Sequence, residues 1–306
     1  MEVLPSSKPA QKPKVPHWAT EHFELFVHGV QDIGTLVRIT ERGVSVLRAM
    51  PRVVKGLAGF KGKWTADATR KHLERAESDA ARAQSELESD FPLLHGLAVI
   101  AIWSALEHFT KALVSSWILH RKDALAAPAL QRLKVKLGEY LHLTRAEQAC
   151  YLVELLEQDL SSPLKVGASR FETLLEPFSL SGQVPADCSK SIFELQQVRN
   201  IIAHRNGRAD KRFRTACPWI KVKLDKPVHV SGKMLERYLD GAIRYALEVF
   251  YRVGDRYGQD LRATKDASSA KKLWKRARRS AEPLMRWAED RFMAVPSRRR
   301  TSACGR

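Results

Sequence analysis

The chain has 306 residues, enough for one large helical domain or two smaller ones, and its hydrophobic content of 44% is ordinary for a globular protein. A formal charge of +18 and a pI near 9.9 favour polyanionic partners, nucleic acid before an anionic membrane surface. A basic surface with no specific partner has the same composition. The cysteines are scattered and form no C-x-x-C pair, which excludes a zinc knuckle and predicts a reducing, cytoplasmic compartment: Cys150, Cys188, Cys217 and Cys304.

The N-terminal part of the chain divides into a proline-rich arm and a helical segment. Residues 1–16 carry four prolines among Ser, Lys and Gln, and they contain no apolar run that would indicate a signal peptide. Residues 17–63 begin with apolar side chains at helical spacing. Pro51 is expected to interrupt this helix, and the glycine-containing, basic stretch 52–63 is expected to be a loop.

Two long helices are predicted next. Residues 64–90 carry charges of both signs at helical spacing, which is typical of a solvated face or a coiled-coil partner. Residues 93–121 form the most hydrophobic stretch and should be the spine of the core. One stripe of this helix is formed by large apolar residues that follow one another at spacings of three or four: Trp103, Leu106, Phe109, Leu113 and Trp117.

This apolar stretch is long enough to span a bilayer, but it contains polar residues near its centre. His95, Glu107, His108 and Lys111 would be costly there, so a buried central helix is the better interpretation and no membrane is expected as a partner. Glu107 lies among apolar residues. It could be a surface residue, or it could be a buried partner for a cation.

Weaker helical segments lead to the central stretch of the chain. Helices are expected over 124–143 and 169–175, and Thr144 with Glu147 has the spacing of a capping box before another helix. Ser191 and Glu194 have the same spacing after a loop at 182–187. They are therefore expected to open the helix that ends at the most polar stretch of the chain.

The C-terminal third mixes a short β element with helices. Apolar and charged residues alternate from Trp219, which predicts a small β-hairpin near 217–230. Ser231 should cap a helix that reaches about Tyr257. More than half of the excess positive charge follows Leu261. We therefore predict an N-terminal arm, a helical segment at 17–63, a helical domain at 64–258 and a basic helix and tail at 259–306.

The polar stretch Gln197–Arg208 holds the residues that carry chemistry. Arg199 can bind a phosphate through its planar fork, and His204 can exchange a proton near neutral pH. Asn200 can orient the histidine or the substrate, and Gly207 should stop the helix. These residue types suit cleavage of a phosphodiester through attack by a ribose 2′-hydroxyl, and they need neither a metal nor a cofactor.

A purely structural interpretation of the same residues exists. In an ideal helix Arg199 and His204 differ by about 140° in azimuth and by roughly 7.5 Å in rise. They could contact one ligand only if the helix end loosens or if the ligand lies along a groove. Arg199 could instead pair with Glu107 or Glu194, and His204 could merely end a helix. Short motifs of this kind recur easily.

The pattern Arg199-Asn200-x-x-x-His204, followed by Arg205-Asn206-Gly207 near a helix end, resembles the HEPN superfamily over about residues 65–257. The hallmark of that superfamily is an Arg, four to six residues and a His, often with Asn after the Arg. The resemblance implies a helical bundle of HEPN type that dimerises so that two motifs face each other. It implies a metal-independent endoribonuclease that leaves a 2′,3′-cyclic phosphate, with Arg199, Asn200 and His204 as the catalytic residues.

Further expectations follow from the resemblance and from the charge. Glu107 would support Arg199, and Arg205 would be a second supporting residue. The partners would be RNA, a second copy of the chain and an antitoxin or other neutralising protein. The biological role would be that of a toxin or of antiviral defence. Other members of the superfamily are inactive, so the alternative is a catalytically inactive module that binds nucleic acid or protein. RNA-binding residues are expected after the motif: Arg208, Lys271, Lys272, Trp274, Lys275 and Arg276. The tail helix that carries the last five could equally dock on the domain or lie on anionic lipid.

Overall fold

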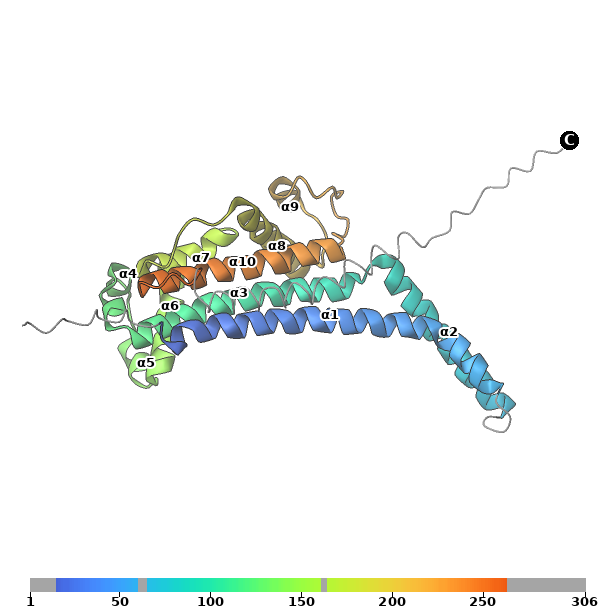
Figure 1. Cartoon of the computed structure of the whole chain (residues 1–306). Coiled ribbons are helices and arrows are strands. Elements are labelled where there is room, and N and C mark those ends of the chain that lie inside the picture. Colours follow the sequence, from blue (N-terminus) through green and yellow to red (C-terminus); the bar gives the residue numbers. More distant parts are fainter. Residues whose placement is uncertain (1–14, 60–64, 161–163, 263–306) are drawn as a thin grey trace, which may run out of the picture.

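The structure is a computed structural model that describes residues 15–59, 65–160 and 164–262. Three long helices run side by side in it (Figure 1): α1 (His17–Ala58), α3 (Pro92–His120) and α10 (Gly232–Arg256). A fourth, α2 (Ala66–Ser89), packs against α1, and the pair projects beyond the rest of the bundle. The prediction of an all-α protein is confirmed for the described residues.

Helix α3 is the central element of this bundle, as predicted. It contacts α1 and α10 as well as α6 (Arg145–Asp159), α7 (Ala168–Leu175) and α8 (Ala186–Arg205). Its predicted apolar stripe is fully buried, with Trp103 and Trp117 no more than 2% exposed. Among the described residues α3 is also the one helix long and apolar enough to cross a membrane, but here half of its most apolar window is buried within the bundle.

Helix α1 does not stop at Pro51, and this corrects the prediction of a loop for residues 52–58; residues 60–63 of that predicted loop lie outside the described residues. The helix continues through Pro51 to Ala58. Proline removes one backbone hydrogen bond and strains one turn, but tertiary packing can compensate for that loss. Val54 is buried just beyond Pro51, and Lys55 Nζ lies 3.4 Å from Glu77 Oε1 on α2. The contact with α2 therefore holds the last turns of α1 in helical form.

A buried polar contact ties α1 to α3. His95 on α3 is inaccessible to solvent, and its Nε2 lies 3.2 Å from Glu41 Oε1 on α1. Its Nδ1 lies 2.8 Å from the carbonyl oxygen of Val230. Burial alone would lower the pKa of His95, but the hydrogen bonds to Glu41 and to the Val230 carbonyl outweigh it and raise the pKa. The contact thereby fixes α1, α3 and the segment before α10 relative to one another.

The chain between α3 and α6 is less regular than predicted. The expected helix over 124–143 consists of three short pieces: the 3₁₀ turn η1 (Lys122–Ala126), α4 (Pro128–Gln131) and α5 (Leu137–Leu141). The capping box before α6 is confirmed. Thr144 Oγ1 accepts a hydrogen bond from the Glu147 amide at 3.3 Å, and Glu147 Oε2 accepts one from the Thr144 amide at 2.7 Å.

The predicted β-hairpin near 217–230 is not formed, and the short helix α9 (Lys211–Ala216) precedes this segment. The backbone of 225–228 pairs instead with the segment after α8. The Val228 amide donates to the Gly207 carbonyl at 2.8 Å, and the Ala209 amide donates to the Lys226 carbonyl at 3.0 Å. The alternating pattern has another origin: Ile220 and Val222 pack against the core, while the lysines between and after them face solvent.

Candidate functional site

The candidate site lies on α8, whose apolar face packs against α3 and α10. The helix begins at Ala186 rather than at Ser191, so the predicted second capping box is wrong. Ser191 is buried inside the helix, and its hydroxyl donates to the Arg237 carbonyl of α10 at 2.8 Å. The Ser191 and Glu194 side chains therefore join two helices and do not cap one.

The end of α8 lies where the sequence predicts it. Asn206 and Gly207 both have left-handed backbone angles, with φ of 50° and 73°. The Gly207 amide donates to the Ile201 carbonyl at 3.0 Å, which satisfies one of the free carbonyls at the helix end. Because α8 keeps its helical form up to Arg205, the helix does not loosen between Arg199 and His204.

Arg199 is half-buried and has no carboxylate partner among the described residues. Its Nη1 donates to Asn200 Oδ1 at 3.3 Å, and its Nε is buried without any hydrogen-bond partner in that part of the chain. Buried polar atoms of proteins are paired in the great majority of cases. Arg199 is thus exceptional, and neither of the pairings that would make it structural, with Glu107 or with Glu194, is present.

His204 and Arg205 are exposed in the last turn of α8. No described residue forms a hydrogen bond or an ion pair with His204, whereas Arg205 Nε lies 3.7 Å from Asp210 Oδ2. Arg208 donates to the Asp225 carbonyl at 2.9 Å and so holds the following loop in place. Arg199 and Asn200 are therefore brought into contact, while His204 stands apart from them and is open to solvent.

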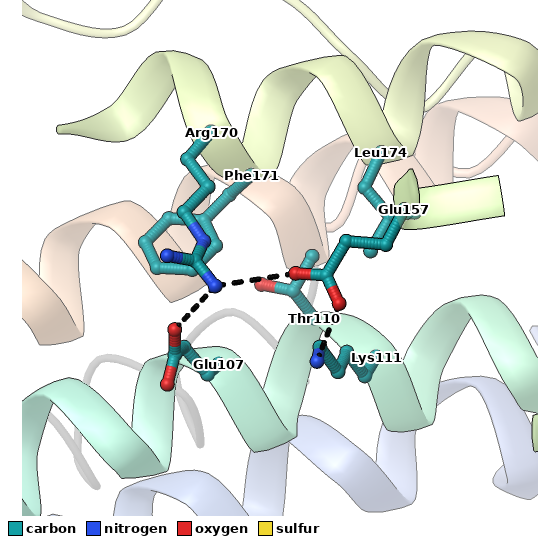
Figure 2. Close-up of a pocket in the computed structure, with 7 residues that line it drawn as sticks. All are labelled: Glu107, Thr110, Lys111, Glu157, Arg170, Phe171 and Leu174. Atoms are coloured by element: carbon teal, nitrogen blue, oxygen red, sulfur yellow. Dashed lines mark hydrogen bonds and ion pairs between the residues drawn. The ribbon is translucent and has the colours of Figure 1, made fainter. Parts of the chain in front are cut away.

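Glu107 does not support Arg199, which corrects the expectation drawn from the resemblance. Its Oε1 lies 2.8 Å from Arg170 on α7 (Figure 2). Arg170 also contacts Glu157 at 3.2 Å, and Lys111 contacts Glu157 at 2.6 Å. These four alternating charges connect α3, α6 and α7 around a cavity of about 10 Å³, which holds at most one water molecule. The cluster is a structural link and has no room for a substrate.

Glu194 is a further residue whose role sequence spacing did not reveal. Its carboxylate is only 2% exposed, and it accepts hydrogen bonds from Tyr238 at 2.7 Å, from Trp219 Nε1 at 2.5 Å and from Arg237. An acidic residue within an otherwise apolar helical face could have indicated such a centre. Through it, α8 holds both α10 and the loop that carries Trp219.

The predicted RNA-binding residues of the tail lie outside the described residues: Lys271, Lys272, Trp274, Lys275 and Arg276. Among the described residues no group of three or more His, Cys, Asp or Glu is arranged to hold a metal ion. Compared with protein-family models, with curated proteins and with solved structures, the chain shows no match.

The unpaired state of Arg199 can be tested by a stability measurement. We expect Arg199→Met to keep the free energy of unfolding within about 0.5 kcal/mol of the wild type or to raise it, because no ion pair is lost. Arg170→Met, a matched control of similar burial, should lower it by roughly 3 kcal/mol, because it leaves Glu107 without its cation and Glu157 with Lys111 alone. Urea titration followed by circular dichroism measures both. A comparable loss in the two variants would show that Arg199 has a structural role.

Proposed function

We propose that the protein is a metal-independent endoribonuclease of HEPN type, with Arg199, Asn200 and His204 as its catalytic residues. The observation that carries this proposal is the half-buried guanidinium of Arg199, which has no carboxylate partner among the described residues. An arginine held in place but left electrically unpaired is suited to an anionic ligand such as a phosphate. A proposed role in toxicity or defence, with a neutralising partner, rests on the family resemblance alone.

The chemistry assigned to these residues is transesterification within RNA. The 2′-oxygen attacks the adjacent phosphorus and loses its proton to His204, while the bond from phosphorus to the 5′-oxygen breaks. The leaving 5′-oxygen takes up a proton from a protonated histidine or from water, and the phosphate becomes a 2′,3′-cyclic diester. Arg199 stabilises the charge on the non-bridging oxygens in the transition state. Asn200 orients the guanidinium through the contact of its Oδ1 with Arg199 Nη1.

A second copy of the chain would complete this site. Since α8 is helical through Arg205, Arg199 and His204 of one chain point in directions that differ by about 140°. One phosphate is contacted more easily by Arg199 of one copy and His204 of another, facing each other across a two-fold axis. We therefore propose a homodimer in which each catalytic site is shared between subunits.

The proposed activity predicts RNA cleavage in the presence of EDTA. Purified protein should cut single-stranded RNA and leave ends with 2′,3′-cyclic phosphates, which mass spectrometry of the products identifies. The Arg199→Ala/His204→Ala double variant should be inactive, whereas Arg145→Ala, a change of an exposed arginine on α6, should cleave like the wild type. Cleavage that survives the double substitution would refute the proposal. Binding of RNA without any cleavage would favour the alternative, a catalytically silent nucleic-acid-binding module.

A further inference from the structure

A basic hollow lies just beyond the end of α8, between α9 and the loop 218–223. Its volume is about 750 Å³, within the range of ligand-binding sites. Its rim carries four cationic side chains, and no acidic residue is among those that line it. We call this feature the α9 hollow and define it by its cations: Lys211, Arg214, Lys221 and Lys223.

The four cations of the α9 hollow are exposed and available to a ligand. None of them forms an ion pair with a described residue, in contrast to Arg205 and Arg208 next to them, which contact Asp210 and Asp225. Like charges placed around one concavity repel each other, and such an arrangement lowers the stability of the isolated protein. An anion with several charges would relieve this repulsion and release its own counterions.

The hollow is connected on two sides to the helix that carries the candidate catalytic residues. Trp219, next to the lining residue Ile220, donates its indole N–H to the buried Glu194 of α8 at 2.5 Å. At the other side, Asp210 precedes α9 and contacts Arg205, the last residue of α8. These contacts place the hollow beside the end of α8, close to His204.

We propose that the α9 hollow binds the phosphate backbone of a single-stranded RNA segment that flanks the scissile phosphate. Spaced lysines and an arginine contact backbone phosphates without reading the bases, so the hollow contributes affinity and orientation but no sequence preference. Thr215 offers a hydroxyl to the sugar or phosphate, and Ile220 and Val222 form an apolar floor. Lys190 Nζ lies over one face of the Trp219 ring at 4.7 Å from its centroid and adds a further cation beside the hollow. The inference rests on the proposed function for the identity of the strand as RNA.

The test measures RNA binding by the full chain as a function of salt. Both arms carry His204→Ala, so that cleavage does not interfere. One arm replaces the four cations of the α9 hollow by Ala. The other removes the same charge from exposed residues elsewhere that form no ion pair with a described residue: Lys122, Lys134, Arg145 and Lys165. Circular dichroism confirms that both variants are folded.

For fluorescently labelled oligouridine, we expect the hollow variant to bind roughly a thousand-fold more weakly at low salt than the chain that carries His204→Ala alone. The slope of log affinity against log salt should become shallower by about 3, since each lost phosphate contact on a single strand contributes roughly 0.7. The control variant should keep most of the affinity at low salt and most of the salt slope. Equal losses in the two variants would overturn the proposal, because total charge would then explain the binding.

Two further outcomes separate the hollow from the catalytic proposal and from a lipid ligand. If the wild type cuts no RNA but the hollow variant still loses RNA binding selectively, the proposed nuclease activity fails and the binding site stands. Vesicles of phosphatidylserine provide the second probe. Selective loss of vesicle binding with unchanged RNA binding would overturn the inference, since the shared phosphate chemistry would then serve a membrane surface.

Discussion

Mixing equal amounts of the Arg199→Ala and His204→Ala variants should restore RNA cleavage to about a quarter of the wild-type rate. Each variant alone is expected to lose roughly 10²–10³-fold in rate, which is the cost of removing one group that stabilises the charge of the transition state or transfers the proton. The restoration follows from the shared site. A mixed dimer keeps one intact pair, in which Arg199 comes from one subunit and His204 from the other, and about half of the dimers are mixed.

The control for this experiment is a mixture of the Arg199→Ala variant with the double variant Arg199→Ala/His204→Ala. No dimer in that mixture contains an intact arginine, so cleavage should stay at the background. Native mass spectrometry of the first mixture, with one variant isotopically labelled, shows whether mixed dimers have formed. Mixed dimers without cleavage would contradict the shared site and would place both groups on the same chain.

The sequence predicts those parts of the fold that depend on periodicity and local capping. The stripe from Trp103 to Trp117 on α3 is buried as expected, because residues at spacings of three and four share one face of a helix. Thr144 and Glu147 form their capping box because both partners lie within one turn. The end of α8 at Asn206 and Gly207 is likewise set by local backbone preferences.

The errors in the fold prediction share a physical cause, which is packing between segments distant in sequence. Pro51 fails to end α1 because α2 packs along the same turns. Ser191 and Glu194 have the spacing of a capping box, but their side chains find partners on α10, more than forty residues later. Local spacing does not distinguish these cases, since the competing partner is specified only by the tertiary structure.

In the candidate site, too, some features follow from local sequence and others depend on tertiary packing. The position of Arg199, Asn200 and His204 on the last turns of a helix follows from the sequence, whereas the partner of Glu107 does not. Glu107 pairs with Arg170 because the packing of α7 on α3 brings the two side chains together. The α9 hollow combines cations from two segments, and its position depends on the contact of Trp219 with the buried Glu194. No local pattern reports such a contact.

Replacing Glu194 by Ala should lower the free energy of unfolding by about 3–5 kcal/mol, the typical cost of breaking a buried charged contact by removing one partner. The Tyr238 hydroxyl and the Trp219 indole would lose a buried acceptor, whereas Arg237 is half-exposed and can turn to water. The isosteric Glu194→Gln keeps an acceptor oxygen and should cost less. Urea titration measures both, and Glu154→Ala, at an exposed position on α6, is the control that should stay within about 0.5 kcal/mol.

Two further measurements on Glu194→Gln, one spectroscopic and one of RNA binding, connect the role of Glu194 in stability to the proposed function. Burial and the neighbouring Glu194 carboxylate both raise the pKa of Tyr238. Glu194→Gln removes the contribution of that carboxylate and should lower the pKa of Tyr238, while burial, the larger cause, still keeps it above its ordinary value; ultraviolet difference spectra of the two proteins at alkaline pH compare them. The same variant should weaken RNA binding, because the loop that carries Lys221 and Lys223 is attached to α8 through Trp219. If Glu194→Gln is less stable but binds RNA with unchanged affinity, Glu194 has a role in the core alone, and the position of the α9 hollow does not depend on it.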